Sequence, residues 1–99
     1  MRLTTADQKA IVNITQQYFD KGSEVYLFGS RVDDNKKGGD IDLYIIPEHK
    51  NNAEQLYHKK IKFLVALQLA IGEQKVDVIL AKDKNRAIEK EAIRTGVKL

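Results

Sequence analysis

Two aspartates at alternating positions of a predicted β-strand constrain this chain more than any other feature of its sequence. Segment 40–46 alternates, with Asp40, Asp42 and Tyr44 on one face and three aliphatic side chains on the other. Asp is depleted in strands, and two like charges on one face of a strand repel each other. Hard divalent cations such as Mg²⁺ take oxygen ligands and are held by one or two carboxylates together with substrate phosphates. The pattern therefore predicts a cation site between the two carboxylates.

A Gly-Ser turn ends the strand that we expect over residues 24–29. The β-branched and aromatic residues that favour a strand stop at Gly29 and Ser30. Glycine lets the backbone approach a ligand closely, and free N–H groups together with a Ser hydroxyl can hold phosphate oxygens. A short helix over about 31–36 would point further amide groups at the same place. The segment 33–39 is a polar, turn-rich loop, and we expect it to be mobile without ligand.

A third aspartate stands in the last strand that we expect, within residues 75–80. Asp77 is flanked there by Val76 and Val78 and is the one acid of the strand. A lone Asp in an otherwise apolar strand is costly if it is buried without a partner. A metal ion shared with the other two aspartates would explain its presence.

The Gly-Ser pair at 29–30, nine intervening residues and the Asp-Ile-Asp segment at 40–42 resemble the signature of the DNA polymerase β-like nucleotidyltransferase superfamily. Arg31 and a chain of 99 residues make the sequence most similar to the minimal nucleotidyltransferases, which often act as antitoxins of HEPN-domain toxins. The resemblance implies a fold of the α/β (α+β) class, a small mixed β-sheet covered by helices, as in the palm of polymerase β. It also implies that Asp77 completes the catalytic set.

The resemblance implies a Mg²⁺-dependent transfer of a nucleotide monophosphate, expected to be AMP from ATP, to a hydroxyl of a partner protein. The partner would be a HEPN-domain toxin that the added nucleotide silences. Two divalent ions about 4 Å apart can activate the attacking oxygen and stabilise the departing oxygen. Asp40 and Asp42 would contact both ions, and Asp77 would hold the ion near the nucleophile and could accept its proton. The triphosphate would be bound by Gly29, Ser30 and Arg31.

Each of these residues also has a plainer structural explanation. The Gly-Ser pair could be an ordinary strand-to-helix turn, Asp40 and Asp42 could face solvent, and Arg31 could be a surface residue. Asp77 could be an edge-strand acid paired with a lysine. Two other functions also stay open: a binding module that neutralises a partner by occlusion, or a nucleotide sensor that binds without transfer.

Three longer helices are expected around the strands. The first begins near Thr4 and ends by about residue 20, and the last covers about 84–95. The helix at about 53–70 carries a wide apolar stripe, which indicates burial against the sheet along most of its length. The expected order is helix, strand, short helix, strand, helix, strand, helix, in a single domain over residues 1–99.

Composition excludes several classes of protein. The chain has no apolar run of about 18 residues, no signal peptide and no cysteine, so we expect a cytoplasmic protein without membrane spans or disulfides. Lys and Arg number 17 against 14 Asp and Glu, and a net charge of +3 is too mild to indicate nucleic-acid binding. His49 and His58 show no metal-ligand spacing, and we expect both on the surface. A homo- or hetero-oligomer stays open.

Overall fold

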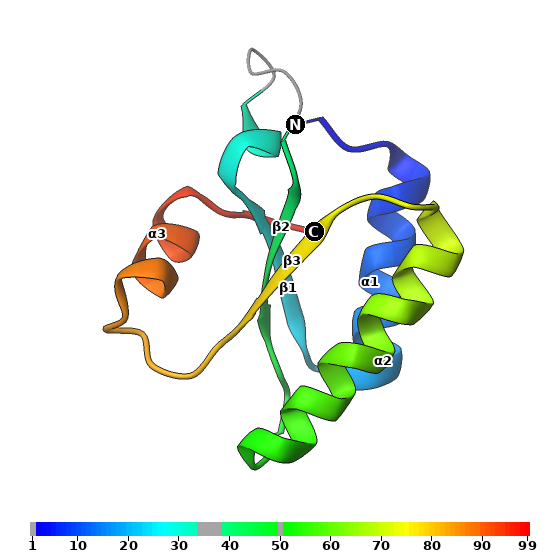
Figure 1. Cartoon of the computed structure of the whole chain (residues 1–99). Coiled ribbons are helices and arrows are strands. Elements are labelled where there is room, and N and C mark those ends of the chain that lie inside the picture. The colour runs from blue at the N-terminus through cyan, green and yellow to red at the C-terminus, as the bar shows by residue number, and fades with distance from the viewer. Residues whose placement is uncertain (1, 34–38, 50) are drawn as a thin grey trace.

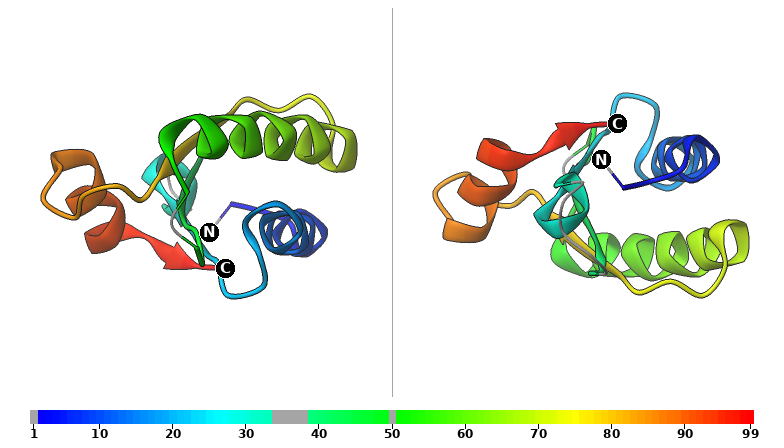
Figure 2. Two further views of the ribbon diagram at one scale, coloured as in Figure 1. Left: turned by 90° about the horizontal axis from the view of Figure 1, so that it is seen from below. Right: turned by 90° about the horizontal axis from the view of Figure 1, so that it is seen from above.

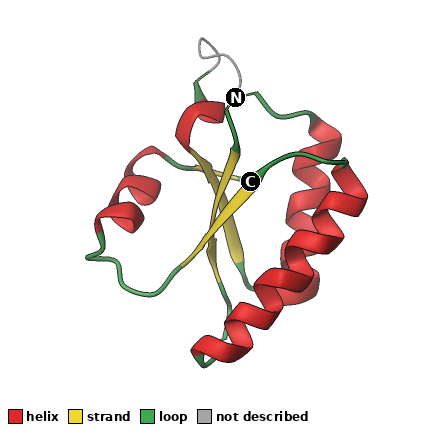
Figure 3. Ribbon diagram, in the orientation of Figure 1, coloured by secondary structure: helices red, strands yellow, loops and turns green. Residues whose placement is uncertain are grey.

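The structure, a computed structural model, describes residues 2–33, 39–49 and 51–99. Helices α1 and α2 lie on one face of a β-sheet, and α3 covers the other face (Figure 1 and Figure 2). The elements, which Figure 3 colours by type, follow one another along the chain in this order: α1 (Thr5–Phe19), β1 (Glu24–Phe28), the 3₁₀ turn η1 (Gly29–Val32), β2 (Ile41–Ile46), α2 (Ala53–Ile71), β3 (Val76–Leu80), α3 (Ala87–Thr95) and β4 (Val97–Lys98).

The described strands form one mixed sheet in the order β3-β2-β1-β4. β1 runs antiparallel to β2 and to β4, whereas β2 and β3 are parallel. A parallel pair needs a long crossover connection, and α2 provides it. The fold class expected from the sequence, a small mixed sheet covered by helices, is confirmed.

Each face of the sheet has its own hydrophobic core. Ile41, Leu43 and Ile45 of β2 are completely buried in the core on the side of α1 and α2, where the rings of Phe19 and Phe63 lie 5.8 Å apart. On the opposite face Tyr44 is completely buried together with Ala92 of α3. Each large apolar side chain buried in this way stabilises the fold by about 1.5–3 kcal/mol. Asp42, two residues before Tyr44 and on the same face, is half-buried.

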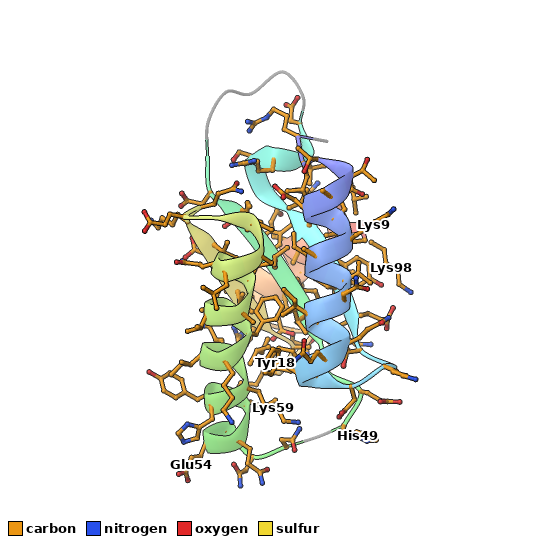
Figure 4. All side chains as sticks on the ribbon, turned by 90° about the vertical axis from the view of Figure 1, so that its right-hand side faces the viewer. Lys9, Tyr18, His49, Glu54, Lys59 and Lys98 are labelled. Carbon is orange, nitrogen blue, oxygen red and sulfur yellow. The ribbon has the colours of Figure 1, made fainter. Side chains whose placement is uncertain are left out.

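The two long helices lie side by side (Figure 4) and begin where the sequence predicts. At the start of α1 the hydroxyl of Thr4 accepts the N–H of Asp7 at 3.0 Å. At the start of α2, Asn52 and Gln55 form a reciprocal capping box. Caps of this kind contribute about 1 kcal/mol each and fix the first turn. α2 ends at Ile71, one residue later than predicted, and Gly72 follows it with a φ of +84°.

The predicted start of the last helix at residue 84 is wrong, because α3 begins at Ala87. The N–H groups of Lys82 and Asp83 donate to the carboxylate of Glu89, and the N–H of Asn85 donates to the side chain of Asp83. These bonds hold the segment before α3 as a turn. These backbone N–H groups therefore bond to side-chain carboxylates and not to the carbonyl groups of a helix. The spacing of apolar residues in the sequence does not reveal such bonds.

The short helix predicted over 31–36 is also misplaced. The 3₁₀ turn starts at Gly29, whose φ of +77° lets the chain turn directly after β1, and it ends at Val32. Asp33 is already extended, with φ −93° and ψ 113°. The predictions for residues 34–38, including the mobility of the loop, lie outside the described residues.

The sequence did not predict β4 as a separate strand. Val97 and Lys98 pair antiparallel with β1, and the N–H of Leu99 donates to the carbonyl of Val25 at 3.0 Å. A strand of two residues has too little alternation to be recognised. None of the helices among the described residues has the length and apolarity needed to cross a membrane.

Candidate active site

Strand register brings two of the three predicted acids together. In the parallel pair of β2 and β3, Asp42 lies directly opposite Asp77. Residues opposite each other in a sheet project to the same face, so both carboxylates point to the same side. Asp40 shares that side by alternation, one residue before β2 begins. The three residues therefore gather where the parallel strands start.

The Gly-Ser turn lies at the same end of the sheet. In the antiparallel pair of β1 and β2, Phe28 is opposite Asp42, so Gly29 follows directly beside this aspartate. A Cβ atom added at Gly29 would overlap Oδ2 of Asp42, and the φ of +77° is itself unfavourable for other residues. Glycine is thus required both by the backbone and by the carboxylate that approaches it.

The electrostatics of Asp42 are unfavourable for its charged form. Burial raises the pKa of this carboxyl above its usual value, and repulsion from Asp77 and then Asp40 raises it further. Lys75 acts in the opposite direction. Among the described residues none donates a hydrogen bond to the side chain of Asp42. A cation beside this carboxylate would offset the repulsion between the aspartates and stabilise the charged form of Asp42.

Lys75 is a neighbour that the sequence did not reveal as part of the cluster. Its Nζ lies 3.3 Å from Oδ2 of Asp40, and its carbonyl accepts the N–H of Ile41 at 3.0 Å. Asp77 is exposed on the edge strand β3, as the plainer explanation expected. The pairing of Asp77 with a lysine, which the same explanation expected, is not found: Lys75 pairs with Asp40, and among the described residues Asp77 has no ion pair.

Ser30 and Arg31 anchor the turn to its surroundings. The carbonyl of Ser30 accepts the N–H of Asp33 at 3.2 Å and a guanidinium N–H of Arg2 at 3.2 Å. The guanidinium of Arg31 donates to the carbonyls of Gly39 at 3.3 Å and of Arg2 at 3.1 Å. These bonds tie the N-terminal segment to both ends of the loop that follows η1. Contact of Gly29, Ser30 and Arg31 with phosphate stays a prediction.

α3 is fastened to the same face of the sheet by a buried carboxylate that the sequence did not indicate. The hydroxyl of Tyr44 donates to Oε1 of Glu89 at 2.8 Å, and Arg86 lies 3.4 Å from Oε2. Burial alone would raise the pKa of Glu89, but hydrogen bonds from Asp83, Tyr44 and Lys82 outweigh it, so the pKa is lowered. Burial first, and then the bond to Glu89, raise the pKa of Tyr44 to about 12.

A second acidic cluster lies at the opposite end of the sheet, where Glu24 pairs with Ile46. Asp20, Glu48 and His49 offer ligand atoms that all lie within 4.8 Å of one another, the one such trio among the described residues. The three aspartates at the other end are not so close together, and Asp40 is paired with Lys75 there. Glu48 and His49 are exposed, which is common for such groups without an ion.

A pocket of about 730 Å³ lies away from the aspartates, at the ends rather than the starts of β2 and β3. It opens between the first turns of α2 and the turn before α3, and its lining includes Leu56, Tyr57, Lys60, Leu80, Lys84 and Arg86. The pocket and the three aspartates are therefore separate features of the molecule.

The family described as "Polymerase beta, Nucleotidyltransferase" matches residues 9–99. The chain belongs to the polymerase β nucleotidyltransferase family. No match was found among curated sequences. Membership assigns a nucleotidyltransferase domain and the general transferase class, and the match spans all the sequence-predicted site residues, 29–31, 40, 42 and 77.

Nucleotidyltransferase domains generally use a divalent metal and a nucleoside triphosphate, and the donor set of this chain fits that use. Asp40, Asp42 and Asp77 offer hard oxygen ligands from adjoining positions of two parallel strands. Gly29 leaves room at Oδ2 of Asp42 that any other side chain would fill. The raised pKa of Asp42 reflects charge repulsion that a cation would reverse.

Proposed function

We propose that this nucleotidyltransferase uses Mg²⁺ and ATP to attach a nucleotide monophosphate to a hydroxyl of a partner protein. Family membership supports the transfer chemistry. The observation that carries the proposal is the register that sets Asp42 beside Asp77, with Gly29 against the same carboxylate. Two carboxylates from neighbouring strands that accept no hydrogen bond within the described part of the chain suit metal ligation better than structural support.

The proposed partner is a HEPN-type toxin, and this chain would act as its antitoxin. The resemblance of segments 29–31 and 40–42 to the minimal nucleotidyltransferases supports this choice. An attached nucleotide adds bulk and negative charge at the modified hydroxyl, as phosphorylation does. The modification would thereby silence the toxin.

The reaction forms a bond between the acceptor oxygen and the α-phosphorus while the bond to the pyrophosphate oxygen breaks. The hydroxyl proton passes to the carboxylate of Asp77, which is exposed and can release it to water. Backbone N–H groups at Gly29 and Ser30, together with the Ser30 hydroxyl, hold the departing phosphates. Divalent ions held by Asp40, Asp42 and Asp77 would supply the positive charge that stabilises the attacking and leaving oxygens.

The test is the transfer of label from α-labelled ATP to a candidate HEPN partner in the presence of Mg²⁺. Wild type should label the partner, and Asp42→Asn should not. Glu91→Gln, which removes an exposed carboxylate paired with Arg94 on α3, is the matched control and should label normally. Transfer that survives Asp42→Asn, or that proceeds fully in excess chelator, would contradict the proposal.

One observation favours occlusion of a partner as a second candidate function. The burial predicted for the wide apolar stripe of α2 is wrong on the outer side of the helix. Four apolar side chains that succeed one another every four residues are exposed there and form one ridge: Tyr57, Ile61, Val65 and Leu69. If this ridge neutralises a partner by binding alone, Ile61→Asp should abolish neutralisation while Asp42→Asn leaves it intact. The opposite pattern would support the enzymatic function.

A further inference from the structure

Lys75 stands in the same geometric relation to Asp40 as Asp77 does to Asp42. The register places Ile41 opposite Val76, so the residues on either side, 40 with 75 and 42 with 77, lie side by side on one face. The Nζ of Lys75 is 3.3 Å from Oδ2 of Asp40. Three carboxylates and one ammonium group therefore occupy the four corners of a single patch.

We propose that Lys75 is a tethered cation that competes with divalent metal for the aspartates, so that the site takes up metal together with the triphosphate rather than alone. This inference rests on the proposed function, because it treats the three aspartates as metal ligands. Asp40 is the point of competition, since the same oxygen cannot bind both an ammonium group and an ion at full strength.

The ammonium group acts on the whole patch and not on Asp40 alone. Lys75 lowers the pKa of Asp42, against the effects of burial and of the two neighbouring aspartates. It cancels one of the three carboxylate charges. Two doubly charged ions already carry more charge than three carboxylates, and the ammonium group enlarges this positive excess, which the phosphates of a bound nucleotide would offset.

The ion pair between Lys75 and Asp40 contributes little to the stability of the fold. Stability therefore does not explain why a lysine lies beside the aspartates. The side chain of Lys75 is 73% exposed and that of Asp40 is 39% exposed. Exposed pairs of this kind are weak because water screens them. A second exposed lysine–carboxylate pair, which serves as a control, lies at the other edge of the sheet. Nζ of Lys98 on β4 is 3.1 Å from Glu24, and the two side chains are 59% and 39% exposed, respectively.

The experiment titrates Mn²⁺ into the nucleotide-free chain by calorimetry. All proteins carry His49→Gln, which weakens the separate cluster at the other end of the sheet. Lys75→Met should bind Mn²⁺ about fivefold or more tightly than its parent, since the ion no longer displaces an ammonium group. Lys98→Met makes the same change in net charge and should leave the affinity unchanged. Lys75→Gln, a second neutral variant, should behave as Lys75→Met does.

The outcomes separate this inference from the function on which it rests. Adding Asp42→Asn should abolish the binding in both the parent and the Lys75 variant, which locates the ion at the aspartates. Binding that depends on Asp42 but is equal or weaker in Lys75→Met would overturn the role of Lys75 and leave the proposed function standing. If neither protein shows binding that depends on Asp42, with or without ATP, both proposals are overturned.

Discussion

Glu89 and Asp42 are carboxylates over the same face of the sheet, and their surroundings are opposite. Glu89 is completely buried, yet it accepts two backbone N–H groups and the hydroxyl of Tyr44, and its pKa is lowered. Asp42 is only half-buried, accepts no hydrogen bond from the described residues and has a raised pKa. Depth of burial therefore does not distinguish the proposed metal ligand from the structural acid. The charges and donors around each carboxylate do.

The largest expected difference between the two acids is in activity. Asp42→Asn should reduce nucleotide transfer by about 10³-fold or more, because a metal ligand is lost from the reaction centre. Glu89→Gln should retain most of its activity at a temperature where it stays folded. Rates of label transfer to the partner under identical conditions measure both. Equal losses in the two variants would remove the distinction.

Stability should show the reverse order. Glu89→Ala should lower the free energy of unfolding by about 3 kcal/mol, since the hydroxyl of Tyr44 and the N–H groups before α3 lose their acceptor. Asp42→Asn should leave the free energy unchanged or raise it, because a repelled charge is removed. Urea unfolding of both variants gives the comparison. A strong destabilisation by Asp42→Asn would make that residue structural.

Two glycines extend the comparison to the backbone. Gly29→Ala should destabilise the chain by about 1–3 kcal/mol, because it combines a φ of +77° with overlap on the short side chain of Asp42. Gly22→Ala also meets a carboxylate, but Glu48 is longer and exposed and can move aside. We expect a smaller loss there. Equal losses in urea unfolding would show that the carboxylate beside Gly29 is not tightly held.

The smallest expected effect is the pH dependence of stability, where the two acids have opposite signs. The pKa of Asp42 is raised by folding, so its charge weakens the fold at neutral pH and that penalty disappears as the pH falls through the raised pKa. The pKa of Glu89 is lowered by folding, so its contribution is complete above the unfolded pKa and is lost as the pH falls through the folded pKa.

Acidification should therefore stabilise wild type relative to Asp42→Asn and destabilise it relative to Glu89→Gln. Unfolding curves at a series of pH values, from neutral down to the limit of the folded range, measure both differences. If the stability of wild type changed with pH in the same direction relative to both variants, the two carboxylates would not have opposite environments.

Strand alternation was enough to predict much of this fold from the sequence. The aliphatic side of β2 and the shared side of Asp40 and Asp42 follow from a period of two residues, and Gly72 marks the end of α2. The start of α3 was not predictable, because the turn before it depends on the buried Glu89, whose acceptor role needs the tertiary fold. β4 is too short to leave a pattern.

The candidate site was only partly predictable for a similar reason. The spacing between the Gly-Ser pair and the aspartates could be read directly, as could the presence of Asp77. The pairing of Asp42 with Asp77 needs the parallel register, which sequence alone does not define. Lys75 looked like one of many surface lysines until that register placed it beside Asp40.

Paramagnetic broadening can show whether the three aspartates bind the divalent ion. Mn²⁺ is added in small steps to the isotope-labelled wild-type chain with ATP, and the amide signals are followed by NMR. We predict that the signals of Gly29, Asp42 and Asp77 disappear first. If the signals of Asp20, Glu48 and His49 disappear first while those of Asp42 and Asp77 persist, the three aspartates are not the metal site.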